Sequence, residues 1–176
     1  MTDPSTLAAL RRARTLALPD WFLAAGWIRG LVWDHLTGQR SDRAGVGLGL
    51  IFHDPADRSW QRDHALDDRL GPPWQARNQA RMHLDKGDPP YGSTLDAMRC
   101  WLETPTAVGV RLEADDSLTV AAPFGLEDLF GLTLRPTPRG RERRADFLAR
   151  LENKAWRRTW PELRLVLDEP QSSLSP

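Results

Sequence analysis

Residues 24–54 constrain the fold more than any other part of this sequence. A helix that starts with glycine is predicted over residues 25–36, and a charged loop follows over residues 39–44. Residues 46–52 form a continuous apolar run, which is typical of a strand buried on both faces. Two glycines, Gly47 and Gly49, stand one residue apart in this run. This segment is therefore expected to hold a helix, a charged loop and a buried strand, in that order.

Apolar periodicity and chain breakers divide the rest of the sequence. Asp20 is expected to cap a long helix that uses Trp21 and Phe22 among its apolar positions. Ser93 or Thr94 is expected to cap a helix further along. The other predicted helices cover residues 5–17, 56–70, 95–101, 126–130 and 142–158. The predicted strands cover residues 74–84 and, as a hairpin, residues 107–112 and 118–122.

Length and charge limit the organisation of the chain. A sequence of 176 residues suits one domain, predicted over residues 1–168 with a disordered tail over 169–176. The 24 basic and 24 acidic side chains cancel, so the net charge gives no support for binding to nucleic acid or membranes. Six arginines nevertheless cluster over residues 135–150, where phosphate could be met. The favoured interpretation of this cluster is a solvated helix face.

Cysteine and histidine usage excludes several kinds of site. The single cysteine, Cys100, rules out an internal disulfide and a cysteine-cluster metal site. The four histidines, at positions 35, 53, 64 and 83, do not have metal-ligand spacing. The N-terminal segment lacks the apolar core of a secretory signal, and no run approaches the roughly 20 apolar residues that cross a bilayer. The predicted location is the cytoplasm, and the oligomeric state is left open.

Several separated strings show a resemblance to a bacterial group of nucleotidyltransferase-like proteins, whose wider superfamily includes poly(A) polymerases and tRNA-tailing enzymes. Together the strings extend over roughly residues 18–165. They comprise residues 18–21, 24–26 with 28–29, 32–36, 52–55, 78–83, 93–94 with 96–98, 104 with 106–108, 122–126 with 128–130, and 135–138. The resemblance implies a single domain of the α/β class (α+β type), with a mixed central sheet flanked by helices.

The resemblance also implies a reaction centre, and two of its positions are altered here. Gly26 and Arg29 are similar to the glycine-containing phosphate loop and helix of the superfamily, where a helix N-terminus faces a triphosphate. Active members place two aspartates one residue apart on the next strand, where both side chains face the same way and bind catalytic Mg²⁺. This chain has Gly47 and Gly49 at those positions, so no metal ligands are assigned and the catalytic residues are unknown.

The leading hypothesis is therefore a nucleotidyltransferase-family protein that binds a nucleotide or another phosphate-bearing molecule without turnover. One alternative is an active, Mg²⁺-dependent transferase using other carboxylates; Asp42 and Asp54 flank the strand, but Asp54 lies too far along it to replace a ligand at position 49. Another alternative is a protein-interaction scaffold that uses a tryptophan-rich surface. The ligand-binding residues expected from the resemblance are Gly26, Arg29, Asn78, Gln79, Arg81 and His83.

Overall fold

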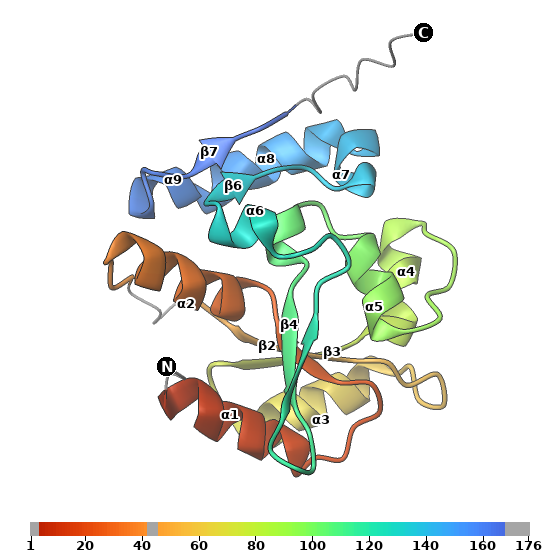
Figure 1. Cartoon of the computed structure of the whole chain (residues 1–176). Coiled ribbons are helices and arrows are strands. Elements are labelled where there is room, and N and C mark those ends of the chain that lie inside the picture. Colours follow the sequence, from red (N-terminus) through yellow and green to blue (C-terminus); the bar gives the residue numbers. More distant parts are fainter. Residues whose placement is uncertain (1–3, 42–45, 168–176) are drawn as a thin grey trace, which may run out of the picture.

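The computed structural model describes residues 4–41 and 46–167 (Figure 1). The α-helices are α1 (Pro4–Arg14), α2 (Gly26–Thr37), α3 (Trp60–Leu70), α4 (Gln79–Lys86), α5 (Thr94–Arg99), α6 (Glu127–Phe130), α7 (Pro138–Glu142), α8 (Arg144–Lys154) and α9 (Trp156–Thr159). A 3₁₀ turn, η1, covers Thr104–Thr106. The strands are β1 (Phe22–Ala24), β2 (Leu48–Phe52), β3 (Trp74–Asn78), β4 (Gly109–Leu112), β5 (Leu118–Ala121), β6 (Thr133–Leu134) and β7 (Arg164–Leu165).

The main sheet among these residues has the strand order β3-β2-β1-β4-β5. Strands β2 and β3 are parallel, whereas β1 is antiparallel to both of its neighbours and β4 is antiparallel to β5. This confirms the predicted mixed central sheet in a single α+β domain, and it also confirms the hairpin formed by β4 and β5. Among the described residues, no helix is both long enough and apolar enough to cross a membrane.

Side-chain alternation gives the sheet two differently packed faces. Leu50 and Phe52 of β2 belong to the larger core, to which α1 and α3 also contribute. Ile51 points the other way and packs with Ala24 of β1 and Met98 of α5. In Figure 1, α1 and α3 lie below the sheet, and α4 and α5 lie on the opposite side. Residues at odd positions of β2, Gly49 among them, therefore face the side that carries α5.

Helix α2 lies between α1 and a C-terminal layer made of α7, α8, α9, β6 and β7 (Figure 1). Trp27 at its N-terminal end donates a hydrogen bond from Nε1 to Thr6 Oγ1 at 3.2 Å. Trp33 is fully buried and meets the rings of Trp160 and Trp156 edge-on, with centroids 5.1 and 6.2 Å away. Because these indoles come from both ends of the chain, the core joins α2 to the C-terminal layer.

The prediction of a helix starting at Asp20 is wrong. Residues Phe22–Ala24 form β1, the central strand, and α2 starts only at Gly26. Asp20 has a φ of 45°, and its Oδ2 accepts a hydrogen bond from Thr94 N at 2.6 Å. The Asp20 side chain, which was expected to cap a helix of its own, thus bonds to the start of α5 instead. Ser93 is the N-cap of α5, as predicted.

Three other predicted boundaries are also corrected. The strand predicted over residues 74–84 ends at Asn78, because the Asn78 side chain accepts a hydrogen bond from Ala80 N and caps α4. The helix predicted over 142–158 is three helices, interrupted at Arg143 and at Ala155, where φ is 46°. The helix predicted from residue 56 starts at Trp60. The predicted tail, residues 169–176, and Asp42 lie outside the described residues.

Candidate functional site

A cavity of about 410 Å³ lies where four distant parts of the chain meet. Its lining includes Ala25, which precedes α2, and Gln79 at the start of α4. Trp101 lines it after α5, Glu103 before η1, and Arg150 from α8. The cavity therefore lies between the sheet side that carries α5 and the C-terminal layer, next to the N-terminal end of α2.

The cavity is mainly basic and contains aromatic surface. Three cationic side chains line it against two carboxylates, so the lining carries a net positive charge. Tyr91 and Trp101 add ring surface suited to packing against a planar group. The charged lining residues are Lys86, Arg143, Arg150, Glu103 and Asp146. A phosphate-bearing ligand with a flat apolar part fits this combination of charge and ring surface.

Glu103 and Arg150 form an ion pair in the cavity wall. Glu103 is 1% exposed, and its Oε1 lies 2.6 Å from Arg150 Nε. The geometry is not that of a hydrogen bond, and within residues 4–41 and 46–167 neither atom has a hydrogen-bond partner. The two side chains thus attract each other by charge, while Glu103 Oε1 and Arg150 Nε make no hydrogen bond to any described residue. Leaving buried polar atoms without hydrogen bonds lowers the stability of the fold.

Arg29 places a buried cation behind this wall, in addition to the half-buried Arg150. It is 5% exposed, and its Nη1 donates to Thr106 Oγ1, a lining residue, at 2.5 Å. Its guanidinium lies 4.2 Å from the ring centroid of Trp156. Burial lowers the pKa of Arg29 to about 10, an effect that Glu103 opposes and Arg150 adds to. Arg29 therefore remains charged at neutral pH, and two arginines share one buried carboxylate.

Helix α2 adds to the positive potential at the same end of the cavity. Ala25, at the N-cap position, has φ 64° and ψ −132° and makes no side-chain capping bond. A Cβ placed on Gly26 would lie 3.7 Å from Arg29 Nη2, so the Arg29 guanidinium folds back to the first turn. Uncapped helix N-termini carry partial positive charge and favour anions.

Asp88, in the loop between α4 and α5, connects this loop to α7 and to the start of α8 through ion pairs. Its side chain is 2% exposed and pairs with Arg139 and with Arg143, whose Nη2 lies 3.4 Å from Asp88 Oδ1. Tyr91 donates its hydroxyl to Asp88 Oδ2 at 2.5 Å, and burial together with this carboxylate raises the pKa of Tyr91. Burial also raises the pKa of the Cys100 thiol, so this lining residue is a protonated thiol at neutral pH.

The two glycines that replace the expected aspartates lie on β2 or directly before it. Gly49 pairs with Ala24 of β1, and a Cβ on Gly49 would lie 3.1 Å from the Ala24 carbonyl oxygen. Gly47 precedes the strand, and a Cβ there would lie 2.3 Å from Cδ of Gln75. The exposed Gln75 side chain therefore fills the space into which a side chain at position 47 would project.

These residues do not fit the divalent metal site that the resemblance implies. Mg²⁺ prefers carboxylate and other hard oxygen ligands, and positions 47 and 49 offer no side chain. Within the described ranges, no group of three or more histidine, cysteine, aspartate or glutamate side chains could hold a metal ion.

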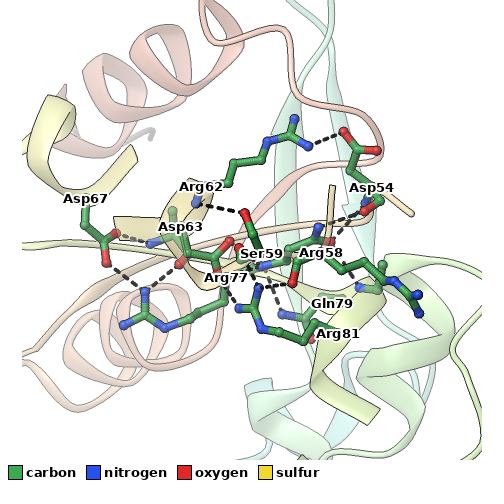
Figure 2. Close-up of polar contacts among 12 residues, drawn as sticks. Asp54, Arg58, Ser59, Arg62, Asp63, Asp67, Arg77, Gln79 and Arg81 are labelled. Atoms are coloured by element: carbon green, nitrogen blue, oxygen red, sulfur yellow. Dashed lines mark hydrogen bonds and ion pairs between the residues drawn. The ribbon is translucent and has the colours of Figure 1, made fainter. Parts of the chain in front are cut away.

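Asn78 and Arg81 belong to a second polar group, which connects α3, β3 and α4. Figure 2 shows Arg81 of this group beside Asp63. Arg81 forms an ion pair with the fully buried Asp63 and donates to the carbonyl of Ser59 at 3.0 Å. The backbone N–H of Asn78 donates to Asp63 Oδ2 at 3.1 Å, and its Nδ2 donates to Asp54 O at 2.8 Å. Both side chains thus use their hydrogen bonds to hold the fold.

A half-buried ion pair of this group, Arg62 with Asp54, is expected to make stability depend on pH. The hydrogen bond from Arg62 to Asp54, 2.5 Å long, lowers the pKa of Asp54 below its ordinary value of 3.8. A lowered carboxylate pKa stabilises the folded state fully above the ordinary pKa, and this contribution disappears as pH falls through the lowered value. Asp54→Asn should cost up to about 1 kcal/mol at pH 7, and this cost should shrink steadily as pH falls below the ordinary pKa of 3.8. Urea unfolding across this range measures it, and a pH-independent difference would contradict the assignment.

Comparison with known proteins identifies the family. The nucleotidyltransferase family model matches residues 11–165. The chain belongs to the nucleotidyltransferase family. One solved structure, described as a CCA-adding enzyme head domain determined by NMR, is 32% identical, with a TM-score of 0.84 over 94% of this chain and 91% of that one. A comparison with proteins of curated function gave no match.

A more distant nucleotidyltransferase structure supports the same fold. It is a CCA-adding enzyme in complex with CTP, 15% identical, with a TM-score of 0.58. The match covers 96% of this chain and 41% of the enzyme, so the chain spans less than half of that protein's length.

The residues predicted from the nucleotidyltransferase resemblance fall into separate groups. Gly26 and Arg29 lie together at the start of α2, behind the cavity wall and outside its lining, whereas Gln79 lines the cavity. Asn78 and Arg81 lie in the network around Asp63, away from the cavity lining. His83 is buried on α4, with its ring 5.9 Å from that of Tyr91, another lining residue. The ligand-binding roles of all six remain predictions.

The sequence interpretation missed the charged half of the cavity. Glu103 carried no local signal, because its burial follows from the pairing of its neighbours with residues near 136. Arg143 and Arg150 belong to the arginine cluster that was interpreted as a solvated face, and both line the cavity. The cluster itself was the available signal.

Proposed function

We propose that this nucleotidyltransferase-family chain binds a nucleotide or another phosphate-bearing molecule in the cavity and does not transfer it. The observation that carries the proposal is a charge imbalance. Two buried or half-buried arginines, Arg29 and Arg150, share the single buried carboxylate of Glu103 next to an uncapped helix N-terminus. An anionic ligand would balance this charge and receive charge-assisted hydrogen bonds.

The proposed absence of turnover follows from the lack of carboxylate ligands at positions 47 and 49, where active relatives hold the metal. Nucleotidyl transfer in related enzymes requires carboxylates that hold cations against the phosphates and the attacking hydroxyl. Gly47 and Gly49 supply none, and the space at position 47 is filled by Gln75. The family membership of the chain supports a nucleotide, and the CTP-bound relative makes CTP the first ligand to test.

Calorimetric titration with CTP, ATP, GTP and UTP tests the proposal. At least one nucleotide should bind with the same affinity in magnesium and in chelator, and no pyrophosphate should be released. If no nucleotide binds in either buffer, the proposal is wrong and a scaffold function gains support. If binding requires magnesium, the proposal of a site without metal is wrong, and carboxylates elsewhere in the chain must hold the metal.

Lys86→Ala should weaken nucleotide binding about fivefold to tenfold, because it removes one cationic group from the lining. The Lys86 side chain is exposed, so the variant should unfold at the wild-type temperature. Lys154→Ala is the matched control, since Lys154 is an exposed lysine at the end of α8 and does not line the cavity. Equal losses in both variants would show a general effect of net charge and would count against the cavity.

A further inference from the structure

The buried carboxylate of Glu103 needs an explanation at a site proposed for phosphate. A negative charge in the lining repels an anion, and Glu103 is 1% exposed, so solvent screens this repulsion poorly. A site built for phosphate alone would gain affinity from a neutral residue at this position.

The hydrogen bonding of Glu103 is also incomplete. In the part of the chain that the structure describes, its Oε1 accepts no hydrogen bond, although Arg150 Nε lies 2.6 Å away. Arg29 Nε and Arg150 Nε are likewise buried without a hydrogen-bond acceptor there. Buried polar atoms are nearly always satisfied, so the two such atoms on lining residues, Glu103 Oε1 and Arg150 Nε, indicate a missing partner.

The arrangement requires a ligand with two different ends. Lys86, Arg143 and Arg150 favour an anionic group, whereas the acceptor oxygen of Glu103 favours an N–H or O–H donor. Inorganic phosphate chains at neutral pH offer mainly acceptor oxygens and negative charge, and a residual P–O–H donor brings that full charge up to the carboxylate. A nucleotide offers donors on its sugar hydroxyls and, for some bases, on an exocyclic amine.

We infer that Glu103 is a specificity-determining residue, which accepts a hydrogen bond from a neutral donor group of the ligand and so selects nucleotides over bare polyphosphates. The inference rests on the proposed function and adds to it the chemical group of the ligand that the protein recognises, a neutral hydrogen-bond donor. It concerns recognition alone and assigns Glu103 no chemical step.

Glu103→Gln tests the inference, because it keeps the shape and removes the charge. Binding of CTP and of inorganic triphosphate is measured by calorimetry on the full chain. CTP affinity should fall about fivefold, the difference between a charged and a neutral hydrogen bond. Triphosphate affinity should stay the same or rise, because a repelling charge is lost. Asp146→Asn is the matched control: it removes the same charge from an exposed lining residue and should not separate the two ligands.

Two further ligands locate the donor. If UTP affinity does not respond to Glu103→Gln, the exocyclic amine of cytosine is the donor; if dCTP affinity does not respond, it is the 2′-hydroxyl. Should the glutamine variant fail to fold, Glu103→Asp keeps the ion pair and shortens the reach by one methylene, with the same expected loss for CTP alone.

The outcomes separate the two proposals. Equal weakening of CTP and triphosphate, or no effect on either, would show that Glu103 only holds Arg150, and would overturn the inference while leaving the proposed function intact. If the wild-type protein binds neither CTP nor triphosphate, the proposed function fails and the inference fails with it.

Discussion

Replacing Gly47 and Gly49 together by aspartate is expected to make nucleotide binding depend on magnesium, with at least about a tenfold gain in affinity, or 1.4 kcal/mol. The two side chains would project from the sheet side that carries α5, with Gly49 paired to Ala24 next to the start of α2. Two hard oxygen ligands in that place would let a cation bridge the protein and the phosphates. The wild-type protein should show no such dependence.

The surroundings of the two glycines refine this experiment. A side chain at 47 must displace Gln75, and one at 49 must move the Ala24 carbonyl by a few tenths of an ångström. Gln75 is exposed and flexible, so adding Gln75→Ala to the double variant should raise the magnesium-dependent gain further. The matched control is Gly47→Asn with Gly49→Asn, which has nearly the same shape without charge. If the asparagine variant gains as much as the aspartate variant, the effect is not metal binding.

Asp63→Ala should cost about 3–5 kcal/mol of unfolding free energy, because it leaves the Arg81 guanidinium buried without its counter-charge. Asp63 is fully buried, Arg81 is 4% exposed, and the same carboxylate accepts from Asn78 N. A loss of this size is large against the stability of an ordinary domain. Urea unfolding followed by tryptophan fluorescence measures it.

Asp68→Ala provides the control on the same helix. Asp68 is exposed, and its replacement should change stability by no more than about 0.5 kcal/mol. If Asp63→Ala costs less than about 1 kcal/mol, the ion pair with Arg81 is not structural. The same reasoning applies to Arg81→Ala, in which lost nucleotide affinity would be meaningful only when measured on protein shown to be folded.

The sequence predicts the elements whose signals are local. Strand β2 follows from its apolar run and the β4–β5 hairpin from two strands around a polar turn. Strand β1 was missed because its three residues, Phe22–Ala24, are apolar and adjoin a helix. Only pairing with β2 and β4, remote in sequence, distinguishes it from a helical start. The end of β3 was missed because Asn78 caps a helix through its side chain, which strand alternation does not show.

The candidate site divides in the same way. Gly26, Arg29 and Gln79 were predicted from a family resemblance that includes their neighbours in sequence. Glu103 and Arg150 are 47 positions apart by their numbering, and they meet only because the C-terminal layer packs over the cavity. A charge pattern along the chain shows that arginines gather, and it does not show which of them faces a buried carboxylate.

The tryptophan cluster has a consequence for the order in which the chain is made. Trp33 emerges from the ribosome early, and its ring is covered by Trp156 and Trp160, which emerge more than a hundred residues later. Until then, the Trp33 ring lacks these two aromatic neighbours. Because domains fold as units during synthesis, the nascent chain cannot complete its core before its last helices appear. The cavity, which needs α8, is completed at the same late moment.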